Sequence, residues 1–258
     1  MKDAALTYDG SFKGFLTCIF TAYEQKLNVV EIVPDGEDQK QLFSKIHNII
    51  TDAVKAQRVL NGIKKKISSN SFTRVKLAFL SEVPGIELKI YQMLQYIFNR
   101  KVKVEHDYSD PTILYIANIA KQVSREKHRM EAFVRFRLTK DDIYFAIIEP
   151  DFNVLPLITK HFKSRYADQK WLIYDIKRKI GVHYDLNKTE FVSLELPEDI
   201  GVLGANPEYF EQGEIYFQRL WKEYFDSTNI KSRVNMRLHV QHVPKRYWKY
   251  LSEKSPFA

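Results

Sequence analysis

The sequence predicts an α+β protein with a central antiparallel sheet built from hairpins and with helices segregated before and after it. Helical periodicity fills the first half of the chain and returns near its end. Between these regions, apolar and polar residues alternate in short runs separated by turn residues, as they do in half-buried strands. Contiguous strands between two groups of helices favour this class over a doubly wound parallel sheet.

The expected helices follow from capping residues and apolar spacing. Ser11 caps a first helix that ends near residue 25, Asp52 starts a basic amphipathic helix, and Pro111 lies in the first turn of a helix running to about residue 127. The other expected helices are 72–80, 86–99, 154–166, 207–226 and a short one after Pro244.

The expected strands are short. LNVVEIV (27–33) is predicted as a strand, whereas 42–51 fits either a strand or a helix. One hairpin turns at Lys140-Asp141-Asp142. A second hairpin, WLIYDIKRKIGVHYDL (171–186), turns near 178–181, and EFVSLEL (190–196) adds a further strand.

Length and composition predict one domain over 1–258, or a helical N-terminal lobe (1–107) packed on an α+β lobe (108–258). The lone Cys18 excludes an internal disulfide and a cysteine-built metal site, so we expect a reducing compartment. No run of about 18 apolar residues and no signal-peptide layout occurs. We therefore expect a cytoplasmic protein without membrane association.

The net charge of +8 and the pI near 9.3 favour a polyanionic partner such as DNA. The charge is unevenly distributed: residues 55–76 hold seven basic residues and no acid, and 229–258 hold seven basic residues and one acid. Residues 190–214 hold seven acids and no base. The alternative is that the lysines near residue 65 only solvate a helix end.

Motifs of common enzyme classes are absent, since the chain has no phosphate-binding GxxxxGK[ST] loop, GxGxxG, HExxH or GxSxG. We therefore expect no cofactor, no bound metal and no self-sufficient catalytic site. One enzymatic alternative is a metal-dependent nuclease, because Asp151 after Pro150 and the later Asp175 and Lys177 follow a PD and [DE]xK pattern. The structural alternative makes Asp151 a helix start and Asp175 a polar strand position.

Candidate DNA contacts lie in two basic segments. Arg135 and Arg137 would share one face of a strand and present two guanidinium groups to phosphate. The residues expected to extend this surface are His128, Arg129, Arg165, Lys177 and Arg178. The alternative is that these arginines pair with neighbouring acids.

The terminal VPKRYWKYL interleaves cations and aromatics, as single-strand-binding sites do. Lys245 and Arg246 are candidates for phosphate contact, while Trp248 either stacks on a base or docks this end on the core. Trp171 and Trp221 are expected in the core.

Five segments together resemble a family known as a domain of unknown function associated with DNA metabolism or DNA repair. They are YDGSFKGFLTCIFTAYE (8–24), HRMEAFVRFR (128–137), IIEPDFNVLPLITKHFKSRYADQKWLIYD (147–175), LWKEYFDSTNIKSRVN (220–235) and VPKRYWKYLSE (243–253). Members of that family often carry histidine after the EPD element, where this chain has Phe152.

The resemblance implies a domain found alone beside a radical-SAM DNA modification or repair protein, or fused behind a uracil-DNA glycosylase-like domain. The favoured hypothesis is therefore a DNA-binding accessory module for such an enzyme. The alternatives are the nuclease and a protein–protein adaptor that does not contact DNA.

Overall fold

The computed structural model describes residues 3–36, 45–100, 102, 104–195, 209–211, 213–228 and 236–254. The chain divides into two compact units, Met1–Ser124 and Arg125–Ala258, and the boundary lies within helix α5 (Pro111–Phe133). Helices and strands occur together as predicted, which confirms the α+β class.

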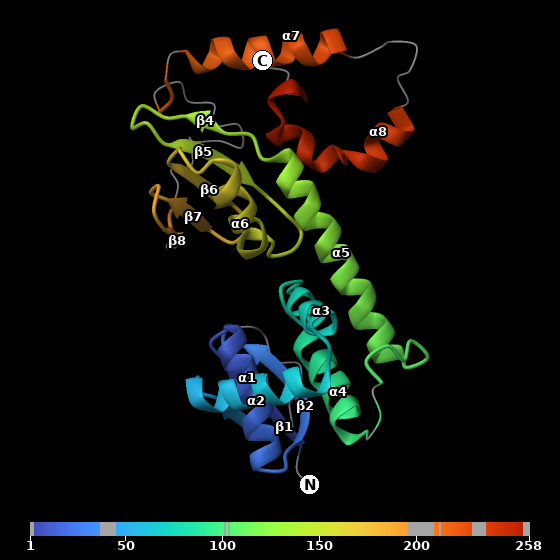
Figure 1. Ribbon diagram of the computed structural model, residues 1–258. Coiled ribbons are helices and arrows are strands. Elements are labelled where there is room, and N and C mark those ends of the chain that lie inside the picture. Colours follow the sequence, from blue (N-terminus) through green and yellow to red (C-terminus); the bar gives the residue numbers. More distant parts are fainter. Residues whose placement is uncertain are drawn as a thin grey trace. The chain divides into compact units, whose positions relative to one another are not determined.

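The first unit holds a small parallel sheet and helices (Figure 1). Its elements are β1 (Asp3–Tyr8), α1 (Phe12–Glu24), β2 (Asn28–Pro34), β3 (Lys45–Asn48), α2 (Ala53–Lys66), α3 (Ser69–Phe79) and α4 (Ile86–Asn99), followed by the start of α5. Strand order is β2-β1-β3, and both pairs are parallel. The sequence analysis missed β1, which is buried from Ala4 to Tyr8 and so lacks the alternation of a half-buried strand.

The helix starts predicted at Ser11 and Asp52 are confirmed, whereas the helix predicted at 72–80 begins earlier, at Ser69. The side chain of Ser11 accepts a hydrogen bond from Gly14 N, and that of Asp52 accepts from the first turn of α2. Helix α4 packs against β2 and α3. Its buried apolar residues recur at helical spacing and are Ile86, Ile90, Leu94 and Ile97.

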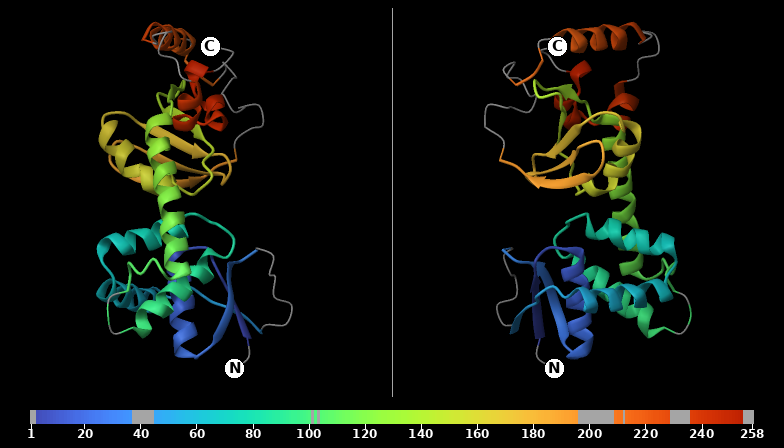
Figure 2. Two further views of the ribbon diagram at one scale, coloured as in Figure 1. Left: turned by 90° about the vertical axis from the view of Figure 1, so that its right-hand side faces the viewer. Right: turned by 60° about the vertical axis from the view of Figure 1, so that its left-hand side comes forward.

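The second unit holds a five-stranded sheet in the order β4-β5-β6-β7-β8. Its elements after α5 are β4 (Arg137–Leu138), β5 (Tyr144–Ile148), α6 (Leu155–Arg165), β6 (Trp171–Asp175), β7 (Ile180–Tyr184), β8 (Thr189–Ser193), α7 (Glu214–Thr228), α8 (Met236–His242) and the 3-10 helices η3 (Lys245–Tyr250) and η4 (Ser252–Lys254). Every pair is antiparallel except β5 with β6, which are parallel because α6 returns the chain between them. Helix α6 contacts β7 and lies beside the sheet in both views of Figure 2.

Both predicted hairpins of this sheet are confirmed, with β4 and β5 flanking residues 139–143 and β6 and β7 flanking 176–179. The strand predicted to carry both Arg135 and Arg137 is wrong in its extent, because α5 continues to Phe133 and β4 begins only at Arg137. The first residues of the helix predicted at 207–226 lie partly outside the described residues, and the described helix begins at Glu214. Among the described helices, none combines the length and apolar character needed to cross a membrane.

Candidate nucleic-acid interface

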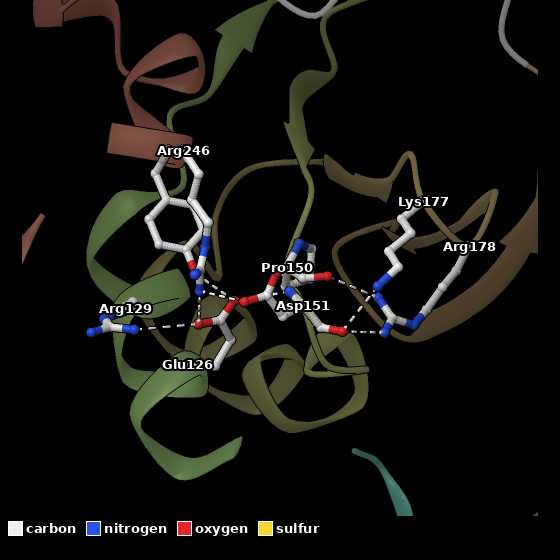
Figure 3. A network of polar contacts seen from close by, with 8 residues as sticks. Glu126, Arg129, Pro150, Asp151, Lys177, Arg178 and Arg246 are labelled. Atoms are coloured by element: carbon white, nitrogen blue, oxygen red, sulfur yellow. Dashed lines mark hydrogen bonds and ion pairs between the residues drawn. The ribbon is translucent and has the colours of Figure 1, made fainter. Parts of the chain in front are cut away.

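A buried carboxylate, Glu126 of α5, organises several of the predicted basic residues (Figure 3). Glu126 is 1% exposed. Its Oε2 accepts from Arg246 Nη2 at 3.0 Å and lies 3.6 Å from Arg129 Nη1. Its Oε1 accepts from Asp151 N at 3.0 Å and from the Tyr247 hydroxyl. Glu126 therefore ties η3 and the loop after β5 to α5.

The loop at Pro150–Asp151 is held from both sides (Figure 3). The Asp151 carboxylate pairs with Arg246 at 2.7 Å. The Asp151 carbonyl accepts from Lys177 Nζ at 3.2 Å and from Arg178 Nη2 at 3.1 Å, and Arg178 Nη1 donates to the Pro150 carbonyl at 3.2 Å. These contacts give the EPD element a structural role in the second unit.

Asp175 is fully buried at the end of β6. It pairs with Arg178 at 2.8 Å and accepts hydrogen bonds from the backbone N–H groups of Lys177 and Arg178. Burial raises the pKa of Asp175, although Arg178 opposes this shift. Arginines thus already occupy the carboxylates of both Asp151 and Asp175, and no cluster of three metal-ligating side chains occurs among the described residues. This geometry does not favour the nuclease alternative.

Arg135 lies between α5 and β4, so strand alternation does not place it beside Arg137. Its Nε and Nη2 donate to the two carboxylate oxygens of Glu253 at 3.3 and 2.8 Å. The same carboxylate accepts from Trp221 Nε1 at 3.1 Å. Arg135 is therefore largely neutralised by a bidentate pair, as the structural alternative anticipated.

Arg137 is the first residue of β4, and its guanidinium lies 5.9 Å from the centroid of the Phe210 ring. Burial lowers the pKa of Arg137, and the nearby carboxylate of Glu214 opposes that effect. Of the residues just before this segment, His128 is exposed and lies 3.8 Å from Glu131.

The cations of the C-terminal segment are partly paired with acids. Lys249 Nζ and the Tyr250 hydroxyl both donate to Glu149, at 2.5 and 2.6 Å. Lys245 is exposed and its Nζ lies 6.0 Å from the centroid of Trp248. Trp248 is partly buried and donates from Nε1 to the Val243 carbonyl at 2.9 Å, a contact within the terminal segment itself. The residue of this segment that is buried in the core is its neighbour Tyr247, which is 1% exposed.

A cleft of about 820 Å³ brings together three of the predicted arginines, Arg135, Arg137 and Arg165, within the second unit. Such a volume is in the usual range for small-molecule and cofactor sites. The cleft is bounded by the end of α5, by α6, by the segment leading to β4 and by α7. Its aromatic lining consists of Phe136, Tyr144, Phe162, Tyr166, Phe217 and Trp221.

Arg165 is the accessible cation of this cleft. Its side chain is exposed, its Nε donates to the Tyr166 hydroxyl at 3.4 Å, and its guanidinium lies 5.7 Å from the Tyr166 ring centroid. Within the described part of the chain, no carboxylate pairs with Arg165. A cation above an aromatic ring at the edge of a cleft can hold a phosphate beside a stacked base.

The part of the cleft lining that comes from α7 carries two large aromatic side chains that remain exposed. Phe217 is 65% exposed and Trp221 is 42% exposed, and their spacing of four residues places them on one face of α7. The prediction that Trp221 lies in the core is wrong, whereas Trp171 is fully buried as predicted. The sequence analysis did not single out Phe217. Its spacing of four residues from Trp221 was the signal that could have placed both side chains on one helix face.

A family model described as a domain of unknown function, DUF4130, matches residues 84–253. The match covers well over half of the chain, so the chain belongs to the DUF4130 family. No curated protein matches the sequence. The matched range contains the described elements of the second unit except Lys254, the last residue of η4, and contains all residues that line the cleft, but within the first unit it begins only just before α4.

Proposed function

We propose that this chain is a nucleic-acid-binding accessory protein of a DNA-repair or DNA-modification system, which holds a single-stranded segment in the cleft of its second unit. The observation that carries the proposal is the exposed Arg165 over Tyr166, facing the same cleft as the exposed Phe217 and Trp221. The net charge of +8 supports a polyanionic partner.

The preference for a single strand follows from the aromatic lining. Aromatic side chains stack on the faces of bases, and those faces are covered by neighbouring base pairs in a duplex. Each stacked base contributes about 1–3 kcal/mol. An exposed Phe217 and an exposed Trp221 in a cleft can therefore bind unpaired bases, whereas the outside of a duplex offers them no equivalent surface.

The resemblance noted above supports an enzyme partner of the radical-SAM or uracil-DNA glycosylase type. Residues for base excision or for an iron–sulfur cluster are not found in this sequence, whose one cysteine is buried in α1. The chemistry would then come from the partner enzyme, and this chain would hold the strand on which the partner acts.

The test is a fluorescence-anisotropy titration of labelled oligo(dT) and of a labelled duplex of equal length. We expect Phe217→Ala to weaken oligo(dT) binding by about tenfold, from one lost stack. We expect Arg165→Gln to reduce the slope of log affinity against log salt by about 0.7. Matched controls are Phe191→Ala, an exposed aromatic on β8 outside the cleft, and Arg219→Gln, an exposed arginine of α7 paired with Glu223.

Equal losses in the cleft variants and in their controls would contradict the assignment of the cleft. Tight binding to the duplex with none to oligo(dT) would contradict the single-strand preference alone. Repeating the titration with the radical-SAM partner tests the accessory role, because a ternary complex should retain the labelled strand at salt concentrations that release it from the chain alone.

The protein–protein adaptor remains a second candidate because one face of α7 is apolar and exposed. Tyr216 is 59% exposed and Leu220 is 40% exposed, and both lie next to the aromatic pair of the cleft wall. Exposed apolar patches of this kind are common at protein interfaces. The adaptor predicts partner binding that survives high salt and no affinity for DNA in the absence of the partner.

A further inference from the structure

The first unit carries a second basic surface, which lies outside the cleft and outside the range matched by the family model. It is formed by the last turn of α2 and by α3. We call it the α2–α3 lysine surface and define it by its four exposed lysines, Lys64, Lys65, Lys66 and Lys76.

The lysine surface is organised around one ring. Lys64 Nζ lies 5.7 Å from the centroid of Phe72, and Lys76 Nζ lies 4.9 Å from the same centroid. Phe72 is only 8% exposed, because it packs into the unit beneath these side chains. Lys66 Nζ donates to the Arg100 carbonyl at 3.4 Å. Two ammonium groups from separate helices are thus gathered over one buried aromatic side chain.

These lysines differ from most of the predicted arginines of the second unit in lacking acidic partners. Across the described residues, no carboxylate forms an ion pair with Lys64, Lys65 or Lys76, whereas Lys55 at the other end of α2 pairs with Glu24. The acid Glu105 accepts from Ser68 N at 2.6 Å and so occupies the N-terminus of α3. A bound anion would therefore be held by the lysine side chains and not by that helix end.

Cations in the last turn of a helix also stabilise the helix dipole, which accounts for part of this pattern. Lys76 lies in the last turn of α3, so the same effect applies to it within its own helix. The effect does not account for the approach of Lys64 and Lys76 to one ring from two separate helices. Unpaired lysines that gather from two helices repel one another, so their arrangement favours a bound polyanion.

We propose that the α2–α3 lysine surface binds the phosphate backbone of nucleic acid without reading bases. Phe72 is covered and cannot stack on a base, so the contact would be electrostatic and independent of sequence. A lipid surface fits less well, because no large apolar side chain between residues 61 and 80 is exposed for insertion into a bilayer. This proposal does not depend on the cleft of the second unit.

The test compares two variants of the full chain that lose the same net charge. Lys64→Gln/Lys76→Gln removes the pair over Phe72, and Lys13→Gln/Lys89→Gln removes two exposed lysines of α1 and α4. Each protein is titrated with labelled oligo(dT) and labelled duplex between about 50 and 200 mM salt. The measured quantity is the salt slope, which is the slope of log affinity against log salt concentration. We expect Lys64→Gln/Lys76→Gln to lower its magnitude by about 1.4 for the single strand and about 1.8 for the duplex, and we expect Lys13→Gln/Lys89→Gln to leave it unchanged.

Equal salt slopes for the two variants, or a parent chain without affinity for either DNA, would overturn this proposal. A lower salt slope in Lys64→Gln/Lys76→Gln together with unchanged oligo(dT) binding by Phe217→Ala would support the lysine surface and would contradict the proposal that the cleft binds the strand. Polyglutamate and phosphatidylserine vesicles serve as further probes. Binding of either as strong as that of DNA, and equally reduced in the lysine variant, would assign the surface to another class of partner.

Discussion

Replacing Glu126 by Gln tests whether its hydrogen-bond network stabilises the second unit. The glutamine keeps one acceptor oxygen, which loses fewest hydrogen bonds when it still accepts from Asp151 N and Tyr247, so that the NH₂ group lies where Arg246 now donates. Loss of one charge-assisted hydrogen bond costs about 1.5–3 kcal/mol. Arg246 also retains its 2.7 Å pair with the half-exposed Asp151, so it does not become an unpaired buried charge, which would cost about 3–5 kcal/mol. We therefore expect a loss of about 2 kcal/mol.

The assay is urea unfolding followed by tryptophan fluorescence. All three tryptophans of the chain lie in the second unit, so this signal reports that unit alone. The control is Glu131→Gln on the same helix, because the partners of Glu131 among the described residues are the half-exposed Lys127 and the exposed His128, and this variant should lose under about 1 kcal/mol. A loss for Glu126→Gln no larger than that of the control would refute the reasoning.

Three further predictions concern single groups. Burial raises the pKa of the Cys18 thiol to about 12, so Cys18 should react with a thiol reagent only as the first unit unfolds, and rapid labelling of the native protein would contradict this. Gly14→Ala should destabilise the first unit by about 1–3 kcal/mol in a thermal melt, because the added Cβ would lie 2.3 to 2.9 Å from side-chain atoms of neighbouring residues. The control is Gly62→Ala, which should be neutral or stabilising because no atom lies within 4 Å of its added Cβ. Burial alone would raise the pKa of Glu253, but the ion pair with Arg135 lowers the pKa overall. The pair therefore stabilises the fold above the unfolded pKa of about 4.3, and this stabilisation is lost as the pH falls below that value. In Glu253→Gln, the free energy of unfolding should fall less steeply over the same pH range.

Much of the secondary structure was predictable because it depends on neighbouring residues. Ser11 and Asp52 cap the helices that they precede, and the turn at 140–142 joins the two strands that alternate beside it. Strand β1 was missed because Ala4–Tyr8 is buried along its whole length, and a short apolar run does not distinguish a buried strand from part of a helix. The parallel pairing of β5 with β6 depends on how α6 returns the chain, which local pattern does not show.

The candidate sites were less predictable, since they depend on which acids reach which bases. Arg135 pairs with Glu253 across 118 positions of the chain, and Arg246 pairs with Glu126 across 120. Patterns of neighbouring residues in the sequence do not predict such distant ion pairs. Conversely, the lysines near residue 65 fit an ordinary solvated helix end, and only the approach of Lys76 from α3 to the same ring distinguishes them.

The packing of α4 has a practical consequence for anyone dividing this chain. The family match begins at residue 84 and so includes α4, yet three elements that α4 contacts, β2, α2 and α3, lie before it. A fragment cut at residue 84 would present Ile90, Leu94 and their apolar neighbours to water without those partners, and such surfaces aggregate. The range matched by the family model is thus shorter than the compact units of the chain, and we expect α4 to be folded stably only where β2 and α3 are also present.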